Sequence, residues 1–257
     1  MRTAIQLYTL RALDESLDQL VARVASTPLD GVEFAYESMN SPTDVASTLA
    51  SHDLELANLS ASVETLETDE AALAEACETL DCETVVLPYL DPSYFDSRDR
   101  VEATADLLSG FARTLDSHGL RFLYHNHAHE FADVDGEVAF DVLLDRVDDR
   151  VEFELDLGWV GTAGEDPYAR LEALGDRAPS VHVKDMHSAT GEFARLGDGD
   201  LDASQAMRIA QAQDVEWAIF EHDEPADPVE ELEHGANRLV EAVESGRLPG
   251  KSSCKNR

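Results

Sequence analysis

Lysine is almost absent from this chain, and cationic residues as a class are scarce. Lysine and arginine number 19 against 54 aspartates and glutamates, which gives a formal net charge of -35. Nucleic acids and anionic membranes are therefore poor partners for this protein. Because like charges at this density repel one another, we expect the fold to need high ionic strength, such as that of an extremely halophilic cytoplasm.

Long hydrophobic segments are missing as well. No apolar run reaches the roughly 18 residues that a membrane helix needs, and no signal-like segment opens the chain. We therefore expect a soluble, cytoplasmic protein.

Cysteines are too few and too irregular for a disulfide framework. Cys77, Cys82 and Cys254 have neither disulfide nor metal-site spacing. We predict that Cys77 and Cys82 are reduced core residues. Cys254 lies in residues 249–257, whose composition departs from the rest, and we interpret this segment as a disordered tail or a remnant of cloning.

Short strand-like runs alternate with longer acidic helical patterns along residues 1–248. In the helical stretches, for instance 16–27 and 69–80, apolar residues recur at i, i+3, i+4 and i+7. The strand-like runs are TAIQLY (3–8), DGVEFA (30–35), LELANLSA (54–61), ETVVLP (83–88), LRFLYH (120–125), VEFELD (151–156), SVHVKD (180–185) and VEWAIF (215–220). Eight strands, each followed by a helix and with no linker, predict an α/β fold, a single-domain (β/α)8 TIM barrel.

A doubly wound dinucleotide-binding sheet is the structural alternative, but its signature is missing. No G-x-G-x-x-G follows the first strand. The stretch GDGD (197–200) is rich in glycine, but its aspartates would repel a phosphate. We interpret it as the approach to a helix that Asp202 caps.

Imidazole and carboxylate side chains occur where four of the strand patterns stop. They are His125 with Glu130, Asp156, His182 and Glu221. Since the C-terminal ends of barrel strands meet at one face, we expect these side chains to converge there. Such groups hold Mn²⁺, Zn²⁺, Co²⁺ or Mg²⁺ while leaving positions open for substrate oxygens. The pattern predicts a site for one divalent metal ion.

Side-chain alternation along the strands sharpens this prediction. In VEFELD the three acidic residues share one face, which we expect to line the barrel lumen. The same alternation turns further polar side chains inward on the neighbouring strands: Ser180, His182, Lys184, His125 and His127. Burial of unpaired charge is costly, so these groups need a metal or one another. Glu152 and Glu154 have barrel arginines, such as Arg11 and Arg121, as alternative partners.

Lys184 is the only lysine outside the C-terminal tail. Its compact charge suits a substrate hydroxyl or a developing enolate. The equally simple alternative is a buried counter-ion to Glu154 or Asp156.

Together these residues resemble the xylose isomerase-like TIM-barrel superfamily of sugar phosphate isomerases and epimerases, which also includes endonuclease IV. The resemblance covers roughly residues 2–248. It rests on IQLYTLR (5–11), DGVEFA (30–35), YHNHAHEF (124–131), ELDLGWVGTAGEDP (154–167), VHVKD (181–185), RLGDGDLD (195–202) and FEHD (220–223).

The resemblance implies one divalent metal, held by a Glu, an Asp, a His and a Glu from the fifth to eighth strands. Asp156, His182 and Glu221 match the last three. The fifth strand departs from the pattern, because His125 stands in H-N-H where many relatives carry Glu in E-N-H. The ligand there is either His125 or Glu130, and we favour Glu130 because it restores the second carboxylate.

The activity that the resemblance implies is isomerisation or epimerisation of a small sugar, keto-sugar or sugar phosphate. A proton would be removed next to a metal-polarised carbonyl. Glu221 is the expected base, and Glu130, His125 or His127 would return the proton on the other face. Lys184 would stabilise the oxyanion. The residues expected to contact the sugar are Tyr8, Arg11, His125, His127, Trp159, Lys184 and Arg195.

Two other functions stay open. A lyase or dehydratase of the inosose type would begin with the same proton abstraction on the same metal. The second is a barrel that binds sugars without catalysis, which the missing glutamate on the fifth strand makes credible. Trp159 stands where endonuclease IV has an extra zinc-binding histidine, so a trinuclear DNA-repair site is not expected. The sequence leaves self-association into a homo-oligomer open.

Overall fold

A computed structural model describes residues 1–34 and 41–246. Its main sheet has the strand order β3-β2-β1-β13-β10-β9-β6-β5-β4, and the paired strands are parallel. The strands are β1 (Arg2–Gln6), β2 (Gly31–Glu33), β3 (Glu55–Leu56), β4 (Leu59–Ser60), β5 (Thr84–Leu87), β6 (Arg121–His125), β9 (Val151–Asp156), β10 (Ser180–Val183) and β13 (Trp217–Phe220). β3 pairs with β2 and β4 with β5, and only Ala57 and Asn58 separate the two short strands. They are thus two halves of one strand, which brings the two ends of the sheet together.

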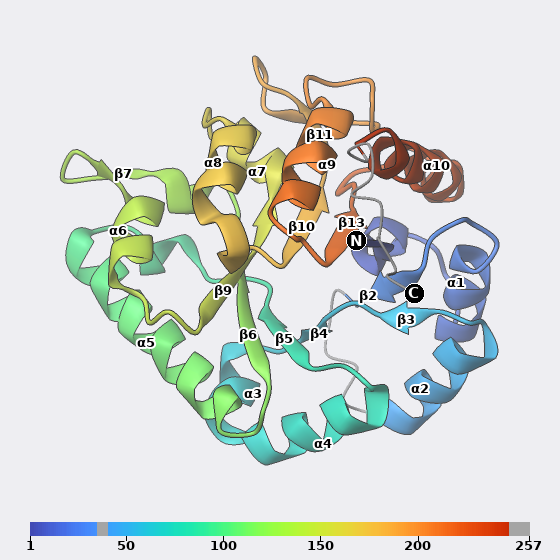
Figure 1. The fold of residues 1–257 in the computed structure, drawn as a ribbon, viewed down its shortest axis with the longest axis horizontal. Helices are drawn as coiled ribbons and strands as arrows, with labels where there is room; N and C mark the ends of the chain where they lie inside the picture. The colour runs from blue at the N-terminus through green and yellow to red at the C-terminus, as the bar shows by residue number, and fades with distance from the viewer. Residues whose placement is uncertain (35–40, 247–257) are drawn as a thin grey trace, which may run out of the picture.

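Helices surround this sheet on the outside (Figure 1). They are α1 (Leu17–Val24), α2 (Pro42–Ser51), α3 (Val63–Thr68), α4 (Glu70–Leu80), α5 (Arg98–Asp116), α6 (Ala139–Arg146), α7 (Leu157–Thr162), α8 (Pro167–Leu174), α9 (Ala203–Ala212) and α10 (Pro228–Gly246). Two small hairpins, β7 (Asp133–Val134) with β8 (Glu137–Val138) and β11 (Asp185–His187) with β12 (Glu192–Ala194), extend from the loops. The predicted single-domain TIM barrel is confirmed, and the predicted tail at 249–257 lies outside the described residues.

The helix and strand patterns explain why these segments fold as they do. In β9 the apolar residues Val151, Phe153 and Leu155 are fully or almost fully buried in the main hydrophobic core, as the alternation predicts. Helix α1 begins with a capping box, in which the side chain of Ser16 accepts from the backbone of Gln19 and the Gln19 side chain accepts from the backbone of Ser16. Such local signals fix the order of strands and helices and thereby bring the strand ends to one face.

The glycine-rich loop before α9 wraps a carboxylate of the chain itself. Asp185 accepts hydrogen bonds from the backbone N–H groups of Gly197, Gly199 and Leu201 at 2.8–3.0 Å. A Cβ on Gly199 would lie 2.3 Å from Asp185 Oδ1, so only glycine fits there. Asp202 then caps α9 by accepting from the Gln205 backbone N–H, as predicted.

The two cysteines within the described residues are buried and free. Burial raises the pKa of the Cys77 thiol to about 12 and that of Cys82 to about 11. Both are therefore protonated core residues, as the sequence predicts.

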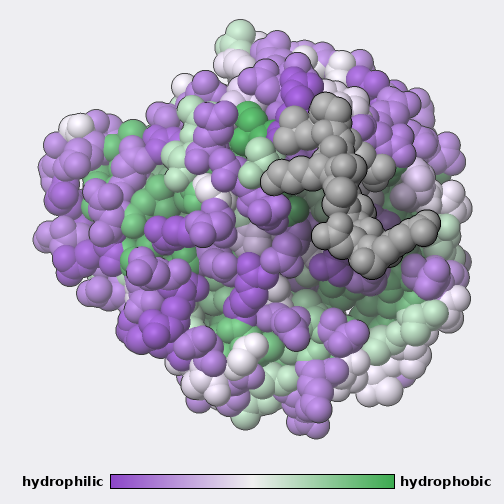
Figure 2. All heavy atoms as spheres, in the orientation of Figure 1, coloured by the Kyte–Doolittle hydropathy of each residue, from purple (hydrophilic) through white to green (hydrophobic). Residues whose placement is uncertain are grey.

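The face of the molecule shown in Figure 2 is mostly hydrophilic, and purple, hydrophilic side chains dominate it. Among the described residues, no helix is both long and apolar enough to span a bilayer.

Stability should depend steeply on salt, because the formal charge of -35 is spread over the surface of the protein. Mutual repulsion of the carboxylates destabilises the compact state, and counter-ions screen it. We expect the melting temperature to rise by on the order of 10 °C between low and molar KCl concentrations. Thermal unfolding followed by circular dichroism across this range measures the effect. A melting temperature that does not change with KCl would refute the halophilic interpretation.

Candidate active site

A cavity of about 550 Å³ opens at the C-terminal end of the barrel strands. Its lining combines carboxylates, imidazoles and aromatic rings. The lining residues are Gln6, Tyr8, Arg11, Glu33, Pro88, Tyr89, His125, His127, Glu154, Trp159, His182, Lys184, Phe193, Glu221, Asp223 and Glu224. This is the face at which TIM barrels place their active sites.

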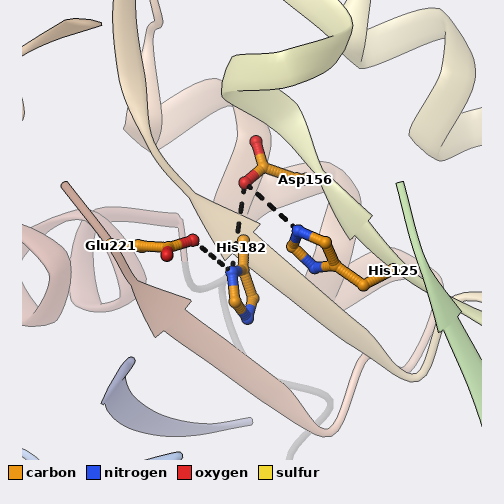
Figure 3. Close-up of side chains that lie close together, drawn as sticks. All are labelled: His125, Asp156, His182 and Glu221. Carbon is orange, nitrogen blue, oxygen red and sulfur yellow. Dashed lines mark hydrogen bonds and ion pairs between the residues drawn. The ribbon is translucent and has the colours of Figure 1, made fainter. Parts of the chain in front are cut away.

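Four buried side chains converge beside this cavity: His125 at the end of β6, Asp156 at the end of β9, His182 in β10 and Glu221 directly after β13. One ligand atom from each lies within 4.8 Å of all the others. His182 Nδ1 lies 2.9 Å from Glu221 Oε2 and 4.0 Å from Asp156 Oδ2, and His125 Nε2 lies 3.9 Å from Asp156 Oδ2 (Figure 3). Consecutive strands of the sheet thus direct two imidazoles and two carboxylates to one point.

The chemistry of this set fits one divalent cation. Bonds of about 2.0–2.2 Å from a single ion would connect two imidazole nitrogens and two carboxylate oxygens after only small side-chain adjustments. Asp156 Oδ2 is buried and accepts no hydrogen bond within the described part of the chain, and its one close charged neighbour there besides the imidazoles is the Lys184 ammonium, at 3.0 Å. Its other oxygen, Oδ1, accepts from the Trp159 backbone N–H at 2.7 Å, which fixes the carboxylate at the start of α7. A set with two imidazole nitrogens among its four ligand atoms suits Zn²⁺, Co²⁺ or Mn²⁺ better than Mg²⁺.

Lys184 brings an ammonium group to the same carboxylates. Its Nζ lies 3.0 Å from Asp156 Oδ2, 3.0 Å from Glu221 Oε2 and 3.1 Å from Asp223 Oδ1. Burial by itself would lower the pKa of Lys184, but these three carboxylates raise it well above its usual value. The ammonium is therefore charged and already paired.

The positive charge of Lys184 in turn acts to lower the pKa values of the carboxyl groups beside it. Burial opposes ionisation of Glu221, yet Lys184 and His182 outweigh it and lower the pKa of that carboxyl below its usual range. Burial raises the pKa of Asp223 to about 6, against the opposing attraction of Lys184. Glu221 is thus a carboxylate at neutral pH.

A second layer of carboxylates lies beneath the four converging residues. Glu154 Oε1 lies 3.2 Å from His125 Nδ1 and 3.1 Å from His182 Nε2, which are the ring nitrogens that face away from Asp156. Glu33 Oε1 lies 3.0 Å from the same His182 nitrogen. Asn58 donates to both glutamates, at 2.8 Å and 2.6 Å. Burial and the charge of Glu154 raise the pKa of Glu33 to about 7.

Glu154 should therefore set the orientation of both histidines. We expect Glu154→Gln to weaken metal binding by about 10–100-fold, as loss of an outer carboxylate partner of a ligand histidine typically does. Glu152→Gln is the matched control, because Glu152 lies on the same face of β9 but pairs with Arg121, at 2.8 Å. Isothermal titration calorimetry with Mn²⁺ measures the metal affinity of both variants. Wild-type affinity in Glu154→Gln would contradict this role.

Glu130 lies apart from the four converging residues. It sits in a short 3-10 turn (His129–Phe131), is completely buried, and accepts hydrogen bonds from the Tyr124 hydroxyl at 2.5 Å and the His127 backbone N–H at 2.9 Å. Burial raises its pKa. The group of residues able to hold a metal contains His125 and not Glu130. The turn thus directs the Glu130 carboxylate back onto its own strand, and the geometry supports His125, the alternative ligand in the sequence prediction.

Most of the side chains expected to contact a substrate do line the cavity: Tyr8, Arg11, His125, His127, Trp159 and Lys184. Arg195 does not. Its guanidinium pairs with Glu230 and Glu231 of α10, each at 3.1 Å. His127 Nδ1 is buried and has no hydrogen-bond partner among the residues that the structure describes.

Several residues of the site were not predicted from the sequence. Asp223 could have been predicted, because it follows the candidate Glu221 by two positions in the motif FEHD (220–223). Glu33 lies close to the end of the strand pattern DGVEFA (30–35), as His182 does in SVHVKD (180–185), so the same signal applied to it. Phe193 comes from the β11–β12 hairpin and packs its ring 4.7 Å from Trp159, and no sequence pattern points to it.

Comparison with known proteins agrees with this architecture. The sequence profile of the xylose isomerase-like TIM barrel matches residues 9–242. A sugar phosphate isomerase/epimerase from Parabacteroides distasonis superposes with a TM-score of 0.78 at 18% identity, covering 94% of this chain and 95% of that one. A probable 3-DHS dehydratase from Bacillus anthracis superposes with a TM-score of 0.74 at 13% identity, covering 93% and 99%.

A curated relative comes from Clostridium beijerinckii. It is an inosose dehydratase, 24% identical over 156 residues, which are 53% of this chain and 52% of the relative. The match therefore spans about half the length of that protein.

Proposed function

Because the chain belongs to the xylose isomerase-like TIM-barrel family, we propose that it is a metal-dependent enzyme of the sugar isomerase and epimerase type. It would act on a small keto-sugar or related polyol by removing the proton next to the carbonyl. The cytoplasm of a halophile is the setting we propose for it.

The observation that carries this proposal is the convergence of His125, Asp156, His182 and Glu221 beside a cavity. These four residues would hold the ion. When bound, a divalent ion supplies polarisation of a carbonyl and charge stabilisation for its neighbouring oxygens.

Glu221 is the residue we propose as the base. It lines the cavity, is ionised at neutral pH for the reasons given above, and is held in place by His182 and Lys184. Lys184 lines the same wall and would donate to a substrate oxygen that gains negative charge.

We expect a single base, Glu221, to remove the proton next to the carbonyl and to return it. The carboxylate of Glu130 is engaged by Tyr124 and His127 and does not line the cavity. Burial, together with the charges of His125 and Lys184, lowers the pKa of His127 to about 2, so this imidazole is neutral at neutral pH and a weak proton donor. Transfer of a proton between adjacent carbons needs only one base, so isomerisation fits better than inversion by two opposed bases.

Dehydration is the second candidate, and the same observation favours it. Loss of water after proton abstraction also needs only one strong base, while an acid at the leaving hydroxyl can come from a neighbouring carboxyl. The partial similarity to an inosose dehydratase points in the same direction.

Solvent exchange of the proton next to the carbonyl tests the proposal. The Mn²⁺-loaded protein is incubated in D₂O with a panel of ketoses and cyclitol ketones, and ¹H NMR follows the signal of that proton. We expect exchange with at least one compound, stopped by EDTA and restored by Mn²⁺. Isomerised product identifies an isomerase, and a dehydrated product identifies a lyase. Binding of these compounds without exchange of any of them would mean a sugar-binding barrel and contradict the proposal.

A further inference from the structure

The charges that line the cavity are mostly negative. Its lysine and arginine side chains are those of Arg11 and Lys184, and three imidazoles also line it, those of His125, His127 and His182. Its carboxylates are those of Glu33, Glu154, Glu221, Asp223 and Glu224. Residues 35–40, which the structure does not describe, have the sequence AYESMN and add neither lysine nor arginine. Even a bound divalent cation would leave this lining without a surplus of positive charge.

Lys184 is a weak counter-ion for a phosphate dianion, because its single charge already faces three carboxylates. Its ammonium already lies within 3.1 Å of carboxylate oxygens from Asp156, Glu221 and Asp223. A dianion placed beside it would also meet these three carboxylates. The repulsion would be strong, because charges in a buried site are poorly screened.

Arg11 is the other cation, and it lies at the mouth. The residue is exposed, its guanidinium stacks 3.8 Å above the centre of the Tyr8 ring, and it donates to the Tyr8 carbonyl at 2.9 Å. Phosphate sites use several converging donors, such as two basic side chains or the amides of a helix N-terminus. A single exposed arginine does not provide this.

The backbone amides that could bind a phosphate are taken by carboxylates of the chain. TIM barrels often bind phosphate at the loops after the seventh and eighth strands. Here the loop after β10 gives the N–H groups of Gly197, Gly199 and Leu201 to Asp185. After β13, the N–H groups of the first turn of α10 donate to Asp227, at 3.0 Å and 3.1 Å. Within the described residues, both of these anion sites are thus closed.

The remaining lining suits hydroxyl groups and apolar ring faces. Trp159 and Phe193 form one wall, with their ring centres 4.7 Å apart, and Tyr8 and Tyr89 add further aromatic surface. Aromatic walls pack against the C–H faces of polyols, and carboxylates accept hydrogen bonds from their hydroxyls.

We propose that the substrate is an uncharged keto-polyol, either an unphosphorylated ketose or a cyclitol ketone, and that the cavity rejects sugar phosphates. This inference rests on the proposed function, because it names the substrate class of the same site.

Paired ligands test it. The Mn²⁺-loaded protein is titrated calorimetrically with fructose and fructose 6-phosphate, with ribulose and ribulose 5-phosphate, and with scyllo-inosose and inositol 1-phosphate. The KCl concentration is the lowest at which the protein stays folded. We expect at least one uncharged member to bind at least about tenfold more tightly than its phosphorylated partner. Binding of the phosphorylated members alone, equal binding within the pairs, or binding of no uncharged member overturns the inference.

A charge-removing variant tests the physical cause. Glu224 lines the cavity, and Glu224→Gln removes one negative charge with little change in shape. We expect the preference for the uncharged ligand to fall at least about threefold. An unchanged preference would contradict the electrostatic basis and with it the inference.

The outcome is separable from that of the proposed function. An uncharged ketone that binds with this preference but never exchanges its proton leaves the inference standing and removes the proposed activity. A sugar phosphate that binds tightly and exchanges its proton would support the proposed activity and overturn the inference about the substrate class.

Discussion

Metal binding should be lost in Asp156→Ala and in His182→Ala, and turnover should be lost with it. Each substitution removes one of four atoms that lie within 4.8 Å of one another. Changing a mere partner of a ligand typically costs 10–100-fold in metal affinity, so removing a ligand should cost at least about 100-fold. Metal content per chain, measured by mass spectrometry after dialysis against Mn²⁺, gives the result directly.

Folding must be checked in both variants, because His182 also contacts the buried Glu33 and Glu154. Circular dichroism and the melting temperature show whether the barrel persists. His127→Ala is the matched control, since His127 lines the same cavity but does not belong to the four converging residues. It should retain one ion per chain. Full occupancy in the Asp156→Ala, His182→Ala double variant would refute the assignment.

His125→Gln should abolish metal binding, whereas Glu130→Gln should preserve it. His125 Nε2 faces Asp156 Oδ2 at 3.9 Å, within the group able to hold a metal. The carboxylate of Glu130 instead receives the Tyr124 hydroxyl and the His127 backbone N–H. Glu130→Gln should therefore lower stability, by about 1–3 kcal/mol for a disturbed buried hydrogen-bond acceptor, and leave the affinity for Mn²⁺ near the wild-type value.

Calorimetric titration of both variants with Mn²⁺ decides between the two residues. Retained affinity in His125→Gln combined with lost affinity in Glu130→Gln would make Glu130 the ligand. It would also restore a second carboxylate for proton transfer, and the one-base scheme would then be wrong.

The sequence predicts the architecture well because the relevant signals are local. Strand alternation with period two places Val151, Phe153 and Leu155 in the core, and it turns Glu154 toward the lumen. The alternative pairing that the sequence offered for Glu152, with Arg121, is present at 2.8 Å. Strand register alone is enough to bring such inward residues together, because the strands are parallel and their ends coincide.

The positions of two predicted site residues, Glu130 and Arg195, depend on contacts that no periodic pattern encodes. Glu130 follows a predicted strand closely enough to reach the metal, but a single 3-10 turn aims it at Tyr124 instead. Arg195 is the first residue of the motif RLGDGDLD (195–202), yet Glu230 and Glu231 of α10 pair with it and it does not line the cavity. The position of Glu130 is decided by a local turn, and that of Arg195 by packing between distant segments.

Crystals grown with Mn²⁺ and measured for anomalous scattering at the manganese absorption edge test the central claim most directly. We predict one strong anomalous peak within about 2.0–2.3 Å of His125 Nε2, His182 Nδ1, Asp156 Oδ2 and Glu221 Oε2. The Lys184 ammonium should then be held by Asp223, the carboxylate that it already contacts at 3.1 Å. A peak coordinated by Glu130, or no peak beside these four residues at full Mn²⁺ saturation, would contradict the account.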